Sequence, residues 1–179
     1  RLGWLDLPDR TRQALPELER LAAGLAADGA RTLYLLGMGG SAIGGDLVRG
    51  IWSDRLRVPL EVVRGNDLPA WVGPDTLVVA SSYSGTTEET ISAFGQAAER
   101  RCPAVIITTG GTFLEVARRA KLPHLSFPGG GQPRAAVGYS VTLLAGVLER
   151  AGMLAIDDAE VARAVVTADA SVAAVLPEV

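Results

Sequence analysis

The stretch from Thr32 to Trp52, TLYLLGMGGSAIGGDLVRGIW, decides the fold of this 179-residue chain. It opens with the short apolar run Thr32–Leu36, which ends at a glycine and is typical of a buried strand. A glycine-rich loop follows, and the residues from Ile43 to Trp52 predict a helix. A buried strand, a loop and a helix in this order predict the opening unit of an α/β fold.

The same order of strand, loop and helix recurs along the chain. Apolar runs predict further strands at residues 59–64, 76–80, 104–107 and 122–127. Apolar residues at helical spacing predict helices at residues 12–27, 88–101, 112–120 and 135–151, and a last helix that begins at Asp157-Asp158 and passes Val161, Val165 and Val172. Because the strands are continuously apolar rather than alternating, we expect a parallel sheet covered on both faces.

Composition and charge exclude several classes of protein. The 17 basic and 20 acidic residues leave a net charge of −3, so binding of nucleic acid through bulk positive charge is not expected. The single cysteine, Cys102, excludes an internal disulfide, and the single histidine, His124, excludes a polyhistidine metal site. No apolar run reaches the roughly 18 residues of a membrane-spanning helix, and no signal-peptide pattern is present. We expect a cytoplasmic protein without a membrane partner.

The loop after the first predicted strand, Gly37–Asp46, has the features of an anion site. Glycines allow close approach of the backbone to a ligand, and the following helix offers unpaired N–H groups and a partial positive charge. Ser41 adds a hydroxyl donor beside Gly40. The segment therefore favours phosphate binding. The alternative is a tight strand-to-helix turn without a ligand.

A second loop, Ser81–Thr90, with the sequence SSYSGTTEET, follows the strand predicted at residues 76–80. One hydroxyl from Thr86 or Thr87 would suffice to cap the next helix, and this is the simpler interpretation. The loop carries six hydroxyl side chains besides its tyrosine, however, and such groups together with backbone N–H groups can surround a phosphate without Lys or Arg. Two such loops on neighbouring strands favour a shared phosphate site.

The third segment of interest is GGGQPRAAVGYS, residues 129–140. Arg134 lies where a glycine-rich loop enters a helix, and arginine pairs well with a phosphate or an oxyanion. The alternative is a surface arginine near a helix start, a position that the helix dipole does not favour.

The first loop also fits a different class of ligand. Gly37, Gly39 and Ala42 match the dinucleotide fingerprint G-x-G-x-x-G/A after a strand. The second strand would then end near Arg64, which suits the 2′-phosphate of NADP rather than the ribose of NAD. This interpretation leaves the second, hydroxyl-rich loop unexplained, so it ranks behind a phosphate site.

Three blocks in the correct order resemble the sugar isomerase (SIS) domain family, and within it the bifunctional phosphoglucose/phosphomannose isomerases. The blocks are GMGGSAIGGD at 37–46, SYSGTTEET at 82–90 and PRAAVGYS at 133–140. The resemblance implies a flavodoxin-like three-layer α/β/α sandwich with a five-stranded parallel sheet. It implies an N-terminal helical segment at residues 1–30, a phosphosugar-binding domain at 31–155 and a C-terminal helix at 156–179 leading toward a second SIS domain.

The resemblance also implies the roles of particular residues. Gly40, Ser41, Ser82, Ser84 and Thr87 would hold the phosphate of the sugar, without a metal or other cofactor. Arg134 would stabilise the enediolate formed while glucose 6-phosphate or mannose 6-phosphate and fructose 6-phosphate interconvert.

The catalytic Glu, ring-opening His and Lys of the family lie in its second SIS domain, whose motifs are not found here. We therefore expect the first half of a homodimeric isomerase, inactive alone. A non-catalytic SIS module that senses a phosphosugar and an NADP-binding oxidoreductase domain are the alternatives.

Overall fold

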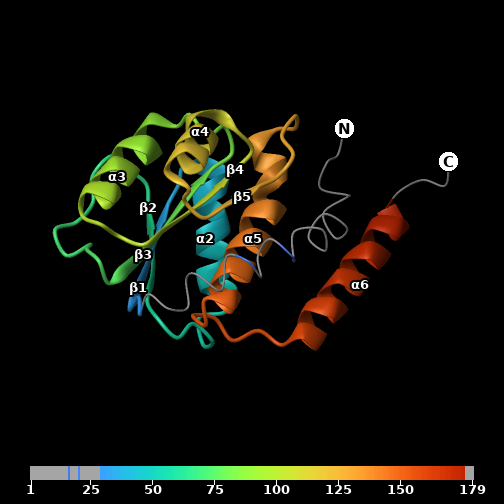
Figure 1. Cartoon of the computed structure of the whole chain (residues 1–179). Coiled ribbons are helices and arrows are strands. Elements are labelled where there is room, and N and C mark those ends of the chain that lie inside the picture. Colours follow the sequence, from blue (N-terminus) through green and yellow to red (C-terminus); the bar gives the residue numbers. More distant parts are fainter. Residues whose placement is uncertain (1–15, 17–19, 21–28, 176–179) are drawn as a thin grey trace.

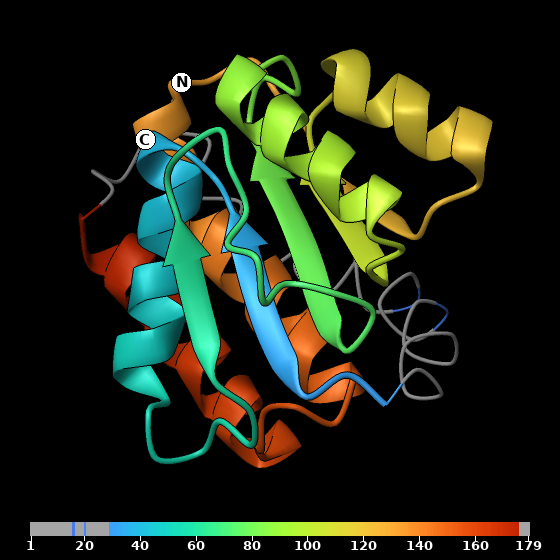
Figure 2. The same ribbon diagram turned by 90° about the vertical axis from the view of Figure 1, so that its left-hand side faces the viewer.

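The computed structural model describes Pro16, Arg20 and residues 29–175, and a five-stranded sheet forms its centre. The strands are β1 (Thr32–Leu36), β2 (Leu60–Val63), β3 (Thr76–Ser82), β4 (Ala104–Thr108) and β5 (His124–Ser126). Their order in the sheet is β2-β1-β3-β4-β5, and every neighbouring pair is parallel (Figure 2). This is the strand order of flavodoxin-like folds, so the predicted fold class is confirmed.

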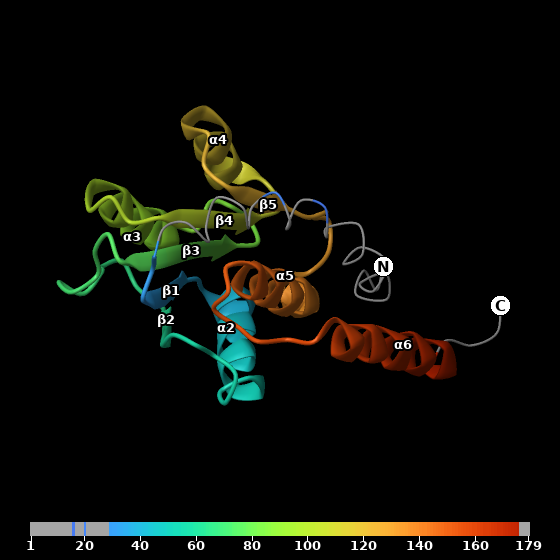
Figure 3. The ribbon, with the colours of Figure 1, turned by 60° about the horizontal axis from the view of Figure 1, so that its bottom comes forward.

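Helices cover both faces of the sheet and complete three layers (Figures 1 and 3). Helices α2 (Gly39–Ile51) and α5 (Val137–Arg150) lie on one face, and α3 (Glu88–Glu99) and α4 (Gly111–Ala120) lie on the other. A 3₁₀ turn, η1 (Pro133–Ala136), leads into α5. Helix α6 (Asp158–Val175) follows and projects away from the layers (Figure 1).

The side chains of the central strands alternate between two hydrophobic cores. On β1, Leu33 and Leu35 pack on the α2 and α5 side, whereas Tyr34 and Leu36 pack on the α3 and α4 side. Successive side chains of a strand point to opposite faces, so a strand covered by helices on both sides must be apolar throughout. This explains why continuous apolar runs predict the strands correctly.

The segment between β2 and β3 crosses the sheet without a helix. Its Leu68 and Val72 are buried in the core on the α3 and α4 side. Two polar side chains at the C-terminal end of α3 hold it there. The side-chain oxygen of Gln96 accepts the backbone N–H of Leu68 at 3.0 Å, and the guanidinium of Arg100 donates to the carbonyl oxygens of Leu68, Pro69 and Val72.

Close contact between α2 and its neighbours depends on small residues. A β-carbon at Gly44 would lie 2.5 Å from Cβ of Ser140 on α5, and one at Gly45 would lie 2.2 Å from Cδ2 of Leu35. Such distances are far inside van der Waals contact. Helix α2 can therefore reach both the sheet and α5 only where these side chains are absent.

Replacing Gly45 by alanine is expected to lower the free energy of unfolding by about 1–3 kcal/mol, the cost of overpacking a filled core. Leu35 is fully buried and has little room to shift. Gly50→Ala on the same helix is the control, because nothing lies within 4 Å of its β-carbon position. It should be neutral or stabilise by about 0.5–1 kcal/mol. Urea unfolding of both variants measures the difference, and equal midpoints would contradict the packing argument.

Among the predicted boundaries that the structure corrects, two involve the glycine-rich and hydroxyl-rich loops. Helix α2 begins at Gly39 rather than at Ile43, and β3 extends to Ser82 rather than ending at Ala80. Glycines carry no apolar periodicity, so the first turn of α2 gives no sequence signal; it is stabilised by contact with the segment before α5. Ser81 and Ser82 continue β3 because they pair with Ile107 and Thr108 on β4.

The ends of the chain are described in part. The helix predicted at 12–27 lies outside the described residues apart from Pro16 and Arg20, which are helical. Asp157 caps α6 as expected, since its carboxylate accepts the backbone N–H of Ala159 at 2.9 Å. The three-part domain division remains a prediction. No helix within the described residues is both long and apolar enough to cross a membrane.

Candidate functional site

The three segments singled out in the sequence meet at the carboxyl edge of the sheet. β1 and β3 are neighbours, and both end there. A β-carbon at Gly37 would lie 3.2 Å from the carbonyl oxygen of Ser81, so the loop after β1 touches the end of β3. A β-carbon at Gly40 would lie 3.1 Å from the carbonyl oxygen of Pro133, so the third segment also reaches the start of α2. In open α/β sheets this edge is where ligands bind.

Three of the predicted phosphate-binding residues form one cluster of hydroxyls. The Oγ1 atom of Thr87 lies 3.0 Å from Oγ of Ser82 and 3.4 Å from Oγ of Ser84. Ser82 is buried and also accepts the backbone N–H of Gly85 at 3.1 Å, whereas Ser84 is exposed. The cluster is thus anchored at Ser82 and open to solvent at Ser84.

The hydroxyl of Thr87 does not cap α3. Thr87 occupies the N-cap position, but its side chain makes no cap hydrogen bond and contacts the two serines instead. Helix α2 likewise starts from Met38 without a side-chain cap, and Ser41 and Gly40 lie in its first turn. Two helices that follow neighbouring strands, α2 after β1 and α3 after β3, therefore present first-turn N–H groups that no N-cap side chain satisfies. Such groups attract an anion.

The hydroxyl-rich loop Ser81–Thr90 is supported by residues at the end of β4, to which the sequence analysis assigned no role. Gly85 has φ of +68°, and a β-carbon there would lie 1.8 Å from the carbonyl oxygen of Gly110. The carbonyl oxygen of Gly85 accepts the N–H of Phe113 at 3.0 Å. Thr108 donates to the carbonyl oxygen of Gly110 at 3.0 Å and holds that turn in place. The run TTGG at residues 108–111, which begins on the last residue of β4, is the signal that the sequence offers for this support.

Arg134 lies on the exposed surface of η1, one residue after the Pro133 carbonyl that touches Gly40. Its guanidinium makes no hydrogen bond or ion pair within the described part of the chain. The structure thus places its backbone beside the start of α2 and leaves its charge available for a ligand. Arg134 lies in the 3₁₀ turn η1 rather than in the first turn of α5, so its position is not explained by capping of an α-helix.

Arg64, the residue on which the NADP interpretation depends, has a partner. Its guanidinium pairs with Asp46 on α2, and the other carboxylate oxygen of Asp46 accepts from Arg49 at 3.1 Å. A 2′-phosphate at Arg64 would therefore compete with an existing carboxylate. Because the pairing is solvent-exposed and therefore weak, it lowers the support for the NADP interpretation only modestly.

No acid/base pair stands out at this edge among the residues that the structure describes. His124 is half-buried on β5, and its Nδ1 lies 2.9 Å from the carbonyl oxygen of Leu122. Burial raises the pKa of Tyr34 and of Cys102, and both belong to the core on the α3 and α4 side. Within the described ranges, no group of three or more His, Cys, Asp or Glu side chains is arranged to hold a metal ion.

Comparison with known proteins identifies homologues of this chain, although no family model matches it. The chain is 38% identical to the bifunctional phosphoglucose/phosphomannose isomerase of Caldicellulosiruptor bescii over 149 residues, which are 83% of this chain and 44% of the relative. It is 34% identical to the D-glucosamine-6-phosphate 4-epimerase of Sulfolobus acidocaldarius, over 68% of this chain and 38% of that protein. The chain thus spans less than half the length of these curated relatives.

A solved structure shows the same fold. A hypothetical protein from Thermus thermophilus, TT0462, superposes with a TM-score of 0.69 at 25% identity, covering 98% of this chain and 44% of the other. The resemblance stated from the three sequence blocks is therefore confirmed: the chain has the SIS-type fold and is homologous to part of the bifunctional isomerases.

Proposed function

We propose, from this homology and from the site at the carboxyl edge of the sheet, that the chain is the phosphosugar-binding part of an aldose–ketose isomerase. The reaction is the interconversion of glucose 6-phosphate or mannose 6-phosphate with fructose 6-phosphate. Both kinds of relative are named for a phosphorylated hexose, so a hexose phosphate is the shared ligand chemistry.

One observation carries the proposal: a three-hydroxyl cluster lies at the start of α3, and both α3 and α2, which follow neighbouring strands, begin without a side-chain cap. A phosphate accepting hydrogen bonds from Ser82, Ser84 and Thr87, and from the backbone near Gly40 and Ser41, would meet both partial positive charges. This is a sufficient arrangement for an anion without Lys or Arg. Fixing the phosphate would place the reacting carbons of the sugar at a set distance.

Arg134 takes the catalytic role in this proposal. Proton transfer between C2 and C1 of the open-chain sugar passes through an enediolate, whose negative charge develops on oxygen. A guanidinium close to that oxygen would stabilise the charge as it forms. Arg134 is the exposed arginine next to the start of α2, and its unpaired guanidinium supports this role.

The proton transfer itself needs a base and an acid, and we assign neither to this chain. His124, the only histidine, is tied to the loop before β5. In our proposal these groups come from a second SIS domain, and this chain without them is inactive.

The proposal includes a cytoplasmic homodimer. Support for an association surface comes from Ile43, Leu47 and Ile51, which follow each other at four-residue spacing on α2 and are 47%, 40% and 57% exposed. Residues at this spacing share one helix face, and such an exposed apolar stripe is typical of an interaction site. Sedimentation equilibrium measures the oligomeric state.

Isothermal titration of fructose 6-phosphate into the chain tests the binding function. We expect a heat of binding for fructose 6-phosphate, and we expect inorganic phosphate to reduce it by competing for the site. NADP is titrated in parallel as the alternative ligand. Binding of NADP without binding of the sugar phosphate would overturn the proposal in favour of a nucleotide site. If neither ligand gives a heat of binding, the chain does not form a phosphosugar site by itself.

Ser84→Ala is expected to weaken fructose 6-phosphate binding by about 1–3 kcal/mol, or roughly 5- to 150-fold in Kd, because a phosphate oxygen loses its partner. Ser84 is exposed, so the fold should tolerate the change. Ser92→Ala on the exposed side of α3 is the matched control and should bind normally. Calorimetry of both variants makes the comparison; equal affinities would remove the hydroxyl loop from the site.

A second candidate reaction follows from the epimerase among the relatives. A 4-epimerase would bind the phosphate with the same groups and act at another carbon of the sugar. These groups, here called the phosphate cradle, are the hydroxyls of Ser82, Ser84 and Thr87 and the backbone near Gly40 and Ser41. Assays of the whole protein with fructose 6-phosphate and with glucosamine 6-phosphate separate the two reactions. Binding without turnover of either substrate would favour a phosphosugar sensor.

A further inference from the structure

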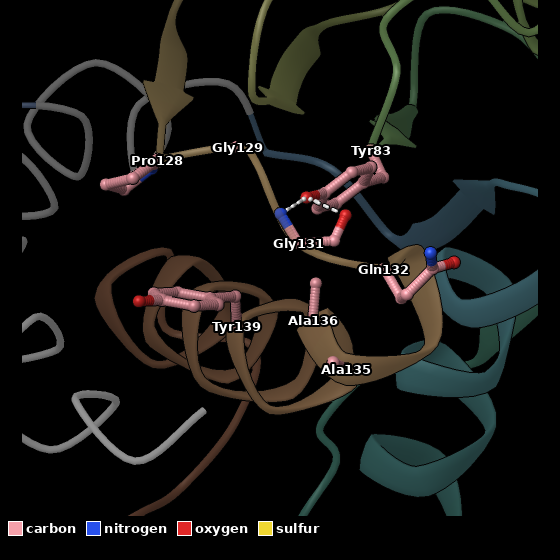
Figure 4. Close-up of a pocket in the computed structure, with 8 residues that line it drawn as sticks. All are labelled: Tyr83, Pro128, Gly129, Gly131, Gln132, Ala135, Ala136 and Tyr139. Carbon is pink, nitrogen blue, oxygen red and sulfur yellow. Dashed lines mark hydrogen bonds between the residues drawn. The ribbon is translucent and has the colours of Figure 1, made fainter. Parts of the chain in front are cut away.

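Tyr83 joins two of the three segments at the site. Its hydroxyl donates to the carbonyl oxygen of Gly131 at 2.8 Å and accepts the N–H of the same residue at 3.0 Å (Figure 4). Tyr83 lies between Ser82 and Ser84 of the hydroxyl loop, and Gly131 lies three residues before Arg134. One side chain thus links the phosphate cradle to the segment that carries the arginine.

Tyr83 is itself held at both ends. The carbonyl oxygen of Tyr83 accepts the hydroxyl of Thr109 at 2.7 Å. Its ring lies 6.0 Å from that of Phe127, which stacks on Tyr139 of α5 at 5.0 Å. The ring is half-buried in this aromatic row, and its packing restrains it. Its hydroxyl therefore offers a defined point to which a glycine-rich segment can be attached.

The segment needs such a point because its own residues provide little restraint. Gly129, Gly130 and Gly131 have no side chains to pack, and Gly130 has φ of +98°. Beyond them, the turn Gln132–Ala135 is closed by a 2.9 Å bond between the carbonyl oxygen of Gln132 and the N–H of Ala135. Arg134 lies inside this turn, so its place relative to the cradle depends on where Gly131 is held as well as on the contact between Pro133 and Gly40.

A small cavity lies beneath the same segment. It has a volume of about 70 Å³ and is lined by Tyr83, Pro128, Gln132, Ala136 and Tyr139 together with Gly129, Gly131 and Ala135 (Figure 4). The segment is therefore not packed tightly on α5 from below. The two bonds to Tyr83 are its main polar attachment to the sheet within the described residues.

We propose that Tyr83 is a positioning residue, which holds the Gly129–Gln132 segment and thereby sets Arg134 over the phosphate cradle. The inference rests on the proposed function of Arg134 and adds a residue to that site. Removing the hydroxyl would leave the phosphate-binding hydroxyls in place, because Tyr83 contributes to them only through the backbone. It would release the segment and spread Arg134 over several positions.

Tyr83→Phe tests the inference, because it removes the hydroxyl and keeps the ring. The first measurement is hydrogen exchange of the Gly131 amide, which we expect to become about tenfold faster after loss of two hydrogen bonds. The second is the kinetics of the whole protein with fructose 6-phosphate. We expect kcat to fall about tenfold while KM and the affinity for inorganic phosphate stay within about twofold. Tyr34→Phe, which removes a hydroxyl on the opposite side of the sheet, is the control.

Coupling to Arg134 separates positioning from a general loss of structure. In an Arg134→Ala background, Tyr83→Phe should have no further effect on kcat, since there is no guanidinium left to place. Unchanged exchange at Gly131, or a loss of kcat that adds fully to that of Arg134→Ala, would overturn the inference. If the wild-type protein has no isomerase activity, the proposed function fails instead, and the exchange of Gly131 alone decides whether Tyr83 holds the segment.

Discussion

Replacing Gly85 by alanine is expected to lower the free energy of unfolding by about 2–5 kcal/mol. The left-handed backbone conformation of Gly85, with φ of +68°, costs an alanine about 1–2 kcal/mol. A β-carbon there would also lie 1.8 Å from the carbonyl oxygen of Gly110, and overpacking of this kind costs about 1–3 kcal/mol. Because the obstacle is backbone, the loop itself must move, and we expect phosphate binding to be lost as well.

Thermal unfolding and phosphate titration check this result together. For a chain of this size the change corresponds to a fall in Tm of roughly 4–20 °C, at about 2–4 °C per kcal/mol. Gly95→Ala on α3 is the control, because nothing lies within 4 Å of its β-carbon position. That variant should keep its phosphate affinity and gain slightly in stability. A Gly85→Ala protein that binds phosphate normally would show that the turn is not part of the cradle.

Replacing Arg134 by alanine is expected to lower kcat of the isomerase about 10²–10³-fold, the usual cost of removing one group that stabilises an oxyanion. KM should change little, because the phosphate cradle holds the ground-state sugar without Arg134. Steady-state kinetics of the whole protein, with fructose 6-phosphate as substrate, provide the measurement. The fold should be unaffected, since Arg134 is exposed and, within the described part of the chain, its side chain makes no polar contact that alanine would break.

Two further variants make the Arg134 result specific. Arg134→Lys keeps the positive charge but loses the planar guanidinium, so it should recover part of the lost kcat. Arg119→Ala removes an exposed arginine from α4 and should leave the kinetics unchanged. A rise in KM with normal kcat after Arg134→Ala would contradict the enediolate role and make Arg134 a substrate-binding residue.

The sheet is predictable from local sequence because its strands are buried on both faces. Runs such as Thr32–Leu36 and Ala104–Ile107 have no charged residue in the middle, and the structure places strands there with boundaries within a residue. The start of α2 is not predictable in this way. Its first turn is glycine-rich, and it is stabilised by Pro133 and Val137, which lie far along the chain on η1 and α5.

The candidate site likewise contains residues that the sequence predicts and residues that it does not. Local composition singles out the three segments, and the family resemblance adds Gly40, Ser41, Ser82, Ser84, Thr87 and Arg134 as their site residues. The structure brings these segments to one edge of the sheet. Their roles in binding and catalysis stay predictions. The sequence assigns no role to the supporting residues Thr108, Gly110 and Tyr83, because threonine, glycine and tyrosine are common at the ends of strands.

Residue types along the chain are enough to establish a parallel α/β sheet whose strand ends carry glycine and hydroxyl groups, since apolar burial and loop chemistry are local properties. Only the tertiary structure decides how those groups are used. It turns the hydroxyl of Thr87 toward Ser82 and Ser84 rather than into a helix cap, and pairs Arg64 with Asp46. It also brings Tyr83 to Gly131, 48 residues away. Each of these outcomes depends on contacts between segments that the chain brings together only when it folds.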